Sequence, residues 1–385
     1  MNVKKQNHAK NLSILMLFVM IFSCGLVYNI NICDAVSAGN EIYEYGDSNN
    51  YIEAAALPSQ LFVCGVPIGI QMQSDGVIVT GFLGFKNEKD EYVNPSLDAG
   101  ILVGDRIVAL SGTEVHSTED LQKCVAESRG KCDIGIIRNN EPCTITMSPD
   151  VSAENHQLKL GLWVKDKTAG IGTLTFVDPE NGSYGALGHG IGNGESHGLF
   201  AMSDGLLYDA AIGGSIAGRI GHPGELQGYF LNDDKGGIGS VELNTDKGVY
   251  GTVNSDVLDS ITDYGKLIHV AYGDSIKVGN ATIYSTISGT TPKEYSVEIE
   301  SINDSSNCSG IKTMSIHITD EELLAATGGI VQGMSGSPVI QNGKLVGAVT
   351  HVLVNDPTRG YAIFIENMLE TANQVAEEQA NKDAS

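Results

Sequence analysis

Short apolar runs interrupted by glycine dominate this chain, and they limit its fold more than any other feature. The 385-residue sequence holds 47 glycines, and these are dispersed among Val-, Ile- and Thr-rich runs instead of forming a G-X-Y repeat. Such punctuated runs are typical of short strands joined by tight turns. We therefore expect a mainly β protein, and the length suggests two or three domains.

The charge balance limits the partners. With 23 Lys and Arg against 47 Asp and Glu, the formal net charge is -24, so we expect no binding to nucleic acid. The glycines lack the spacing of a phosphate loop. The seven cysteines include no zinc-like Cys/His group, so we expect buried cysteines, no metal and no cofactor.

The N-terminal residues have the pattern of an export signal. Lys4, Lys5 and Lys10 precede a nearly continuous apolar stretch from Leu12 to Val27, which is longer than an ordinary signal core and short for a membrane span. Residues 1–38 are therefore interpreted as a signal peptide or a membrane anchor, with both alternatives open. Residues 39–56 are polar and acidic, as expected of a linker.

The next segment, residues 57–150, is expected to form a small, partly open β-barrel. One helix is expected at Ser117–Ser128, where Ser117 or Thr118 is a suitable N-cap residue. Residues 94–112 and the helix start at 117–121 resemble the second half of a PDZ domain. That resemblance implies strand addition of a peptide ligand, from a partner or from another copy of the chain.

The resemblance also implies a peptide-binding loop, which the sequence places at Val66, Pro67, Ile68, Gly69 and Ile70. Pro67 removes one backbone donor from this loop. Capture of a terminal carboxylate is therefore less favoured than strand addition. The alternative is a PDZ-like domain that only packs against its neighbour.

Residues 151–370 contain about twelve further short β runs, which favour two packed barrels or a sandwich. Ala, Glu and Gln at helical spacing from Asn367 to Asn381 predict a C-terminal helix. Residues 371–385 are expected to be a polar C-terminal helix or tail.

The segment Gly333-Met-Ser-Gly-Ser-Pro338 precedes an apolar strand and resembles the nucleophile segment of chymotrypsin-like serine proteases. Gly333 and Gly336 let the backbone turn, so that Ser335 presents its hydroxyl while the N–H groups of Gly333 and Ser335 form an oxyanion hole. Ser337 is the competing nucleophile, and we expect its side chain to face the other way.

A serine nucleophile needs a base, and His189 between two glycines at the end of a β run is the strongest candidate. Two further histidines of the mature chain, His197 and His222, lie in Gly-rich loops. Three others lie inside apolar runs and are expected to be structural, with satisfied hydrogen bonds: His269, His317 and His351.

Taken together, the export segment, the PDZ-like region, the motif at 184–190 and the segment 327–338 resemble the SpoIVB peptidase family of endospore-forming bacteria. The resemblance covers about residues 57–370. It implies a PDZ domain followed by a chymotrypsin-like double β-barrel, with Ser335 as nucleophile, His189 as general base and Asp320 as the acid.

The sequence does not decide which residue is the acid of the triad. Asp320 has the sequence context of a helix N-terminus, where a carboxylate is favoured by the helix dipole alone. The alternatives are Asp204, Asp209 and the Asp233–Asp234 pair, or a Ser–His apparatus without a carboxylate.

The resemblance further implies an exported serine endopeptidase that acts between the mother-cell and forespore membranes. Its substrate would be a membrane-bound regulator, whose cleavage releases an intramembrane metalloprotease to process pro-sigma-K. Self-cleavage is expected within residues 39–60. The rival hypothesis is a non-catalytic PDZ adaptor that keeps only the protease shape.

Overall fold

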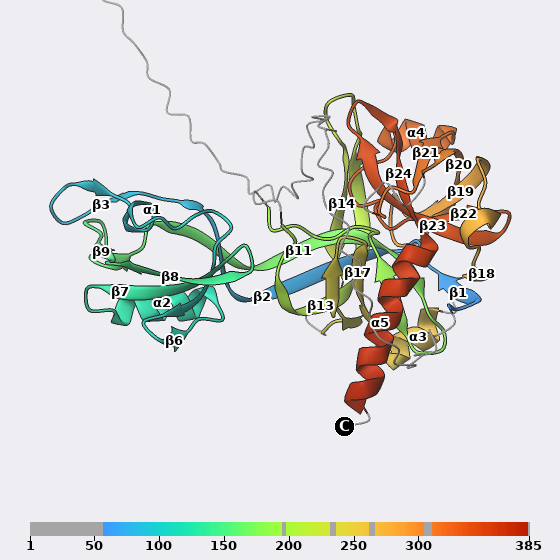
Figure 1. Cartoon of the computed structure of the whole chain (residues 1–385). Coiled ribbons are helices and arrows are strands. Elements are labelled where there is room, and N and C mark those ends of the chain that lie inside the picture. The colour runs from blue at the N-terminus through green and yellow to red at the C-terminus, as the bar shows by residue number, and fades with distance from the viewer. Residues whose placement is uncertain (1–56, 195–197, 232–235, 262–265, 304–309, 384–385) are drawn as a thin grey trace, which may run out of the picture.

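The computed structural model describes residues 57–194, 198–231, 236–261, 266–303 and 310–383. It is mainly β, as predicted, and consists of a PDZ-like unit joined to two packed barrels (Figure 1). The signal or anchor at 1–38 and the linker at 39–56 lie outside the described residues. No helix in the described ranges is long and apolar enough to cross a membrane.

Two long strands connect the units. Strands β2 (Pro67–Phe82) and β11 (Leu162–Val177) pair antiparallel from Leu162–Phe82 to Thr173–Pro67. Figure 1 shows them as a ribbon that runs from the PDZ-like unit into the barrels. The PDZ unit, defined here as residues 76–165, is thus inserted between two strands of the first barrel. The expected boundaries of 57–150 and 151–370 are corrected accordingly.

The PDZ unit packs around a separate apolar core that includes Val79, Ile107 and Ile134. Its helix α2 (Thr118–Glu127) begins as predicted, because the Ser117 hydroxyl accepts a hydrogen bond from the N–H of Asp120. The other elements are β3 (Phe85–Lys86), β4 (Tyr92–Val93), α1 (Pro95–Asp98), β5 (Arg106–Leu110), β6 (Thr113–Glu114), β7 (Cys132–Arg138), β8 (Glu141–Met147), β9 (Asp150–Val151) and β10 (Leu158–Lys159).

The first barrel is a ring of strands. Antiparallel pairing links β13 to β2, β2 to β11, β11 to β12, and β12 to β17. Strand β15 pairs with β13, and the bridge between Gly239 and Val253 joins it to the β17 side. The elements are β1 (Gln60–Val63), β12 (Ser183–Ala186), β13 (Met202–Ile216), β14 (Glu225–Phe230), β15 (Gly239–Ser240), β16 (Leu243–Thr245), β17 (Gly248–Thr252), α3 (Ser255–Ile261) and β18 (Lys266–His269).

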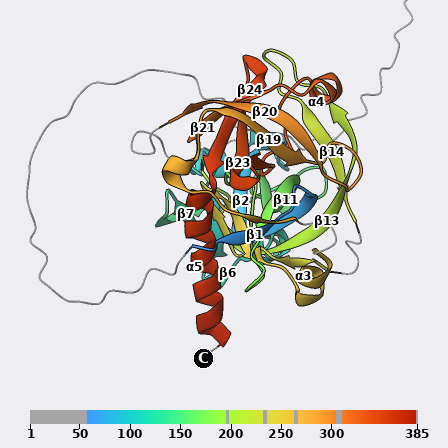
Figure 2. The same ribbon diagram turned by 90° about the vertical axis from the view of Figure 1, so that its right-hand side faces the viewer.

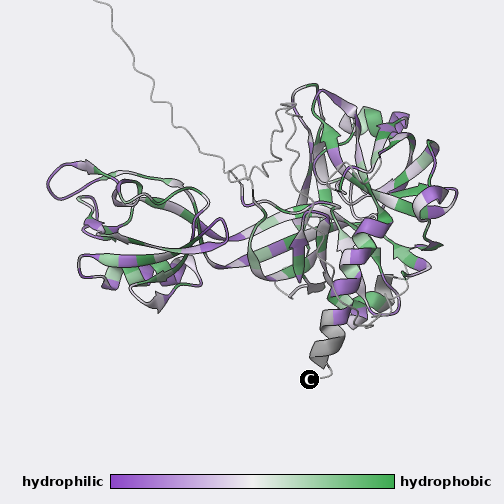
Figure 3. Ribbon diagram, viewed as in Figure 1, coloured by the Kyte–Doolittle hydropathy of each residue, from purple (hydrophilic) through white to green (hydrophobic). Residues whose placement is uncertain are grey.

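The second barrel is closed, in the strand order β19-β20-β21-β24-β23-β22. Every second residue of β20 is buried for most of its length, and apolar side chains of this barrel form a buried core. Figure 3 shows hydrophobic and hydrophilic residues alternating along the ribbon of this barrel. Its elements are β19 (Gly279–Ser285), β20 (Lys293–Ile302), β21 (Met314–Ile318), α4 (Glu321–Thr327), β22 (Pro338–Gln341), β23 (Lys344–Leu353) and β24 (Asp356–Phe364), preceded by a 3-10 turn at Gly273–Ser275.

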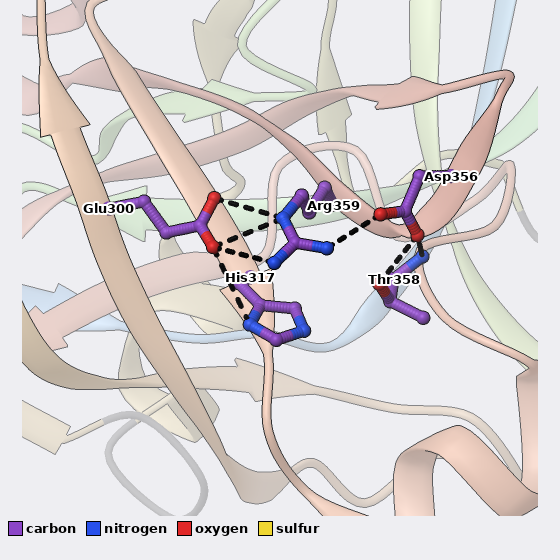
Figure 4. A network of polar contacts seen from close by, with 5 residues as sticks. All are labelled: Glu300, His317, Asp356, Thr358 and Arg359. Atoms are coloured by element: carbon purple, nitrogen blue, oxygen red, sulfur yellow. Dashed lines mark hydrogen bonds and ion pairs between the residues drawn. The ribbon is translucent and has the colours of Figure 1, made fainter.

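A polar network fastens neighbouring strands of this barrel (Figure 4). The Arg359 guanidinium on β24 donates to both Glu300 carboxylate oxygens on β20, and its Nη1 lies 2.6 Å from an Asp356 oxygen. His317 on β21 lies 3.6 Å from the same Glu300. These histidine and arginine side chains therefore have structural partners.

Helix α5 (Ile365–Asp383) follows β24 and packs in front of the barrels (Figures 1 and 2). Met368, Ala372 and Val375 are buried in a core shared with Phe176 of the first barrel and Ile363 of the second. The helix was predicted, but residues 371–375 are part of the folded core and not a polar tail.

We predict that Arg138→Ala destabilises the PDZ unit by about 3 kcal/mol. The Asp105 side chain is 1% exposed, and Arg138 donates two hydrogen bonds to its carboxylate. Removing the arginine leaves a buried charge without its cation. Urea unfolding followed by the fluorescence of Trp163, the single tryptophan, measures the loss. Arg129→Ala, at an exposed position, is the control and should change stability by less than about 0.5 kcal/mol.

Candidate active site

The serine loop, defined as residues 333–337, lies against the first barrel. Gly336 has φ +95°, and a Cβ there would lie 2.2 Å from the Thr173 carbonyl oxygen and 2.6 Å from the Leu187 nitrogen. Only glycine allows this approach. The loop of the second barrel therefore rests directly on β11 and on the turn that leads to His189.

Three hydrogen bonds hold the serine loop on β11. The Thr173 hydroxyl donates to the Gly333 carbonyl at 2.8 Å, and the Thr173 N–H donates to the Ser335 carbonyl at 3.2 Å. The Thr175 hydroxyl donates to the Gly336 carbonyl at 2.7 Å. The carbonyl groups of the loop are thus turned toward the first barrel.

The two serines of the loop face different surroundings. Ser335 is half-buried, and its hydroxyl donates to the Thr350 carbonyl on β23 at 2.8 Å. Ser337 is fully buried and donates to the Ser285 hydroxyl at 2.9 Å. The expectation that Ser337 faces away from the site is confirmed.

His189 lies in the turn after β12. Its Nδ1 is 3.0 Å from the Gly190 carbonyl oxygen; because a carbonyl oxygen only accepts, Nδ1 carries the proton and Nε2 keeps a free lone pair. Burial lowers the pKa of His189, and the Gly190 hydrogen bond offsets part of that shift. The ring is therefore neutral near pH 7.

The turn of His189 approaches β23, the strand whose Thr350 carbonyl accepts a hydrogen bond from Ser335. A Cβ on Gly188 would lie 2.9 Å from Cγ2 of Thr350, the residue whose carbonyl accepts the Ser335 hydroxyl. His189 and Ser335 are not hydrogen-bonded to each other here. The Ser335 hydroxyl must leave Thr350 before it can donate to His189.

The two backbone N–H groups that are predicted to form the oxyanion hole are available for a ligand. The Gln332 carbonyl accepts from the Leu226 N–H at 2.8 Å. Because the two ends of a trans peptide point in opposite directions, the Gly333 N–H is directed away from Leu226. Within the described ranges, neither the Gly333 N–H nor the Ser335 N–H has a hydrogen-bond partner.

The structure does not bring Asp320 to the site. Asp320 is the N-cap of α4: its carboxylate accepts from the Leu323 N–H at 3.0 Å and from the Ser296 N–H at 3.2 Å. Both oxygens are occupied by backbone donors, and Nδ1 of His189 faces Gly190. The expectation that Asp320 completes a triad is corrected here: it is a helix cap.

The alternative acids do not replace it among the described residues. The Asp204 carboxylate accepts from the Gly205 N–H, and Asp209 is exposed on β13. Residues 233 and 234 lie outside the described residues, as does His197. His222 is exposed in a loop, where its backbone pairs with Arg219.

His351 was missed. Its ring centroid lies 5.0 Å from that of His189, at an interplanar angle of 41°. Burial lowers its pKa to about 3, with His189 and Lys312 adding to the shift. The expectation of satisfied hydrogen bonds is wrong here, because the buried Nδ1 has no partner in the described part of the chain. The available signal was its place on the second strand after the serine loop.

The expected PDZ loop is also corrected. Residues 66–70, that is Val66, Pro67, Ile68, Gly69 and Ile70, lie at and after the start of β2, and from Pro67 onward they pair with β11. Ile68, Gly69 and Ile70 also pair with β13 on the other side. These residues have no free edge for a ligand strand, and they belong to the wall of the first barrel.

Other groups with reactive side chains are not gathered into sites. Cys64 and Cys132 are buried, whereas Cys143 is exposed. Over the ranges that the structure describes, no three His, Cys, Asp or Glu side chains cluster so as to hold a metal ion.

Two β-barrels that bring a glycine-flanked serine loop against a glycine-flanked histidine turn define a chymotrypsin-like serine peptidase, with a PDZ unit inserted between two strands of its first barrel. The chain belongs to the SpoIVB peptidase S55 family, whose family model matches residues 156–369, more than half of the sequence.

Solved structures with partial likeness are of low identity. The Rv3671c protease from M. tuberculosis in its active form is 14% identical, with a TM-score of 0.30 over 54% of this chain and 74% of that chain. The HtrA-type protease AlgW with a decapeptide is 13% identical, with a TM-score of 0.32 over 59% and 56%. The PDZ domain of an SdrC-like protein from Listeria monocytogenes is 13% identical, with a TM-score of 0.19 over 23% and 87%. A search of curated proteins found no match.

We predict that Asp320→Asn leaves peptidase activity within about threefold of wild type. Asparagine is as good an N-cap as aspartate, and only one of the two backbone bonds is lost, which costs about 1 kcal/mol. A triad carboxylate replaced by an amide would instead cost about 10⁴-fold in rate. The rate of peptide cleavage, measured beside the thermal midpoint, decides between these roles. A loss of more than 10³-fold at unchanged stability would contradict the capping role.

Proposed function

We propose that the chain is a serine endopeptidase in which Ser335 is the nucleophile, His189 the general base and the N–H groups of Gly333 and Ser335 the oxyanion hole. The observation that carries this proposal is the docking of the serine loop on β11, because it places the Ser335 segment against the turn of His189 and leaves those two donors free. Rival carriers of the same chemistry, such as Ser337, are buried.

The reaction begins with rotation of the Ser335 hydroxyl from the Thr350 carbonyl to Nε2 of His189. Attack on the substrate carbonyl forms the Oγ–C bond while the proton passes to His189, and the oxyanion accepts from Gly333 and Ser335. The imidazolium then protonates the leaving amine, which leaves an acyl-enzyme. His189 takes a proton from water as the water oxygen attacks the ester carbon, and the resulting imidazolium gives that proton to Oγ of Ser335 as the Oγ–C bond breaks and the acid product leaves.

We further propose a role in sporulation signalling. Family membership supports protein substrates, and the family resemblance favours a membrane-bound regulator of an intramembrane metalloprotease as the substrate. The sequence of residues 1–38 supports export, with action between the mother-cell and forespore membranes. Self-cleavage in the polar stretch 39–60 accords with its composition.

The PDZ unit is proposed to bind an extended segment of a partner or of another copy. Its β8 carries exposed residues along most of its length and is the last strand of the sheet order. A sheet edge of this kind accepts an added strand. A unit that only packs against its neighbour is less favoured, because the ribbon of β2 and β11 separates it from the second barrel (Figure 1).

We predict that Ser335→Ala abolishes both self-cleavage and cleavage of added polypeptide, with at least about a 10³-fold loss. Purified residues 39–385 are incubated, and fragments are followed by intact mass. Ser337→Ala is the matched control from the same loop; it removes one buried hydroxyl bond and should keep activity within severalfold. Cleavage that persists in Ser335→Ala would remove Ser335 from the mechanism.

The pH dependence of kcat/KM should show a base whose pKa lies below the ordinary value of a histidine. Because burial lowers the pKa of His189, the neutral, active form persists to lower pH than it would in an exposed histidine. We therefore expect kcat/KM to rise with pH through a value below about 6.5 and to be level at pH 7. An acid limb centred above pH 7 would contradict this assignment.

A further inference from the structure

Within the described residues, the centre has a base without a carboxylate partner and, beside it, an imidazole whose buried Nδ1 has no hydrogen-bond partner. His189 is held at Nδ1 by a backbone carbonyl, and no acidic side chain within the described ranges is hydrogen-bonded or ion-paired with its ring. His351 lies next to it, with ring centroids 5.0 Å apart. The two features meet where the turn of His189 packs against β23 of the second barrel.

His351 is built into the same strand that positions the nucleophile. Its neighbour Thr350 accepts the Ser335 hydroxyl through its carbonyl. The backbone of β23 is fixed there by pairing of His351 with Tyr361 on β24. One short segment of β23 therefore contacts both Ser335, which belongs to the second barrel, and His189, which belongs to the first.

The polar character of His351 is costly where it stands. Its Nδ1 is buried and has no partner in the described part of the chain; a buried polar atom without a hydrogen bond reduces stability. A phenylalanine would fill the same space without that loss. A side chain that is unfavourable for folding and lies against a catalytic group is a candidate for function.

We propose that His351 is a positioning residue of the peptidase: its ring packs beside the His189 ring, while the Gly190 carbonyl takes the place at Nδ1 that a carboxylate has in a Ser-His-Asp triad. Its neutral ring restricts the His189 imidazole to one orientation. Its unused nitrogen offers a polar contact when His189 becomes an imidazolium. No proton passes to His351: the proton from Ser335 stays on Nε2 of His189 until the leaving amine takes it.

The neutrality of His351 is essential to this role, since a second cation would oppose the charge on His189. The charged or titratable groups that act on it are His189 itself and Lys312, and both disfavour its protonation, in addition to burial. The Lys312 ammonium lies over the Tyr361 ring, 5.0 Å from its centroid. The ring of His351 is therefore uncharged throughout the working range of the base.

This inference rests on the proposed roles of Ser335 and His189, and the test separates the two. The probe is a fluorophosphonate, which labels an activated serine without needing the natural substrate. Wild type and Ser335→Ala are compared first: equal labelling would overturn the proposed function itself. The rate of labelling is then measured from pH 5 to 9 for His351→Phe, His351→Asn and the control His317→Phe, in residues 39–385.

We expect His351→Phe to slow labelling at least 10-fold and His351→Asn to recover part of that loss, because asparagine restores a polar atom near the place of Nδ1. His317→Phe, in the same barrel but 3.6 Å from Glu300 and not beside His189, should label like wild type. A packing role predicts the reverse order, with Phe active and Asn impaired. Either that order or unchanged labelling in His351→Phe overturns the proposal.

A second measurement does not depend on activity. The pKa of His189 is followed by NMR of labelled imidazole in Ser335→Ala and in Ser335→Ala with His351→Phe. We expect the pKa of His189 to fall further when the polar neighbour is removed, and to return toward its starting value with His351→Asn. An unchanged pKa in the folded double variant would overturn the positioning role.

Discussion

Close packing of the serine loop on the first barrel is the contact on which the whole site depends. Gly336 allows the loop to approach the backbone of Thr173 and Leu187 to distances that no side chain would permit. The hydroxyls of Thr173 and Thr175 then fix the loop carbonyls. Once those carbonyls are turned inward, the N–H groups of Gly333 and Ser335 are left available for an oxyanion.

The same strand joins this contact to the PDZ unit. Strand β11 leaves the PDZ unit paired with β2, enters the first barrel, and carries Thr173 and Thr175 beneath the serine loop. The insertion of the PDZ unit between β2 and β11 therefore places both of its connections in the wall of the active site. A PDZ domain attached by a linker would lack this continuity.

Sequence patterns predicted what depends on local chemistry. The mainly β class, the N-cap of α2 and the inward side chain of Ser337 follow from strand periodicity, capping and glycine turns, and these expectations are confirmed. Long-range pairing carries no local mark, so residues 66–70 were assigned to the PDZ loop although they pair with β11 and β13. The sequence context of Asp320 fitted both a helix N-cap and the acid of a triad. In the structure its carboxylate accepts a hydrogen bond from the Leu323 N–H, as an N-cap does. His351 was expected to be structural because it lies in an apolar strand. The sequence does not show that its side chain packs beside His189.

The central claim is that Ser335 attacks within a site assembled from both barrels. A crystal structure of the chain after reaction with a peptidyl phosphonate tests it most directly. We predict a single Oγ–P bond at Ser335, a phosphoryl oxygen within about 3 Å of the Gly333 and Ser335 nitrogens, and loss of the Ser335–Thr350 hydrogen bond. An adduct on another residue, or an oxygen turned away from those two N–H groups, would contradict the claim.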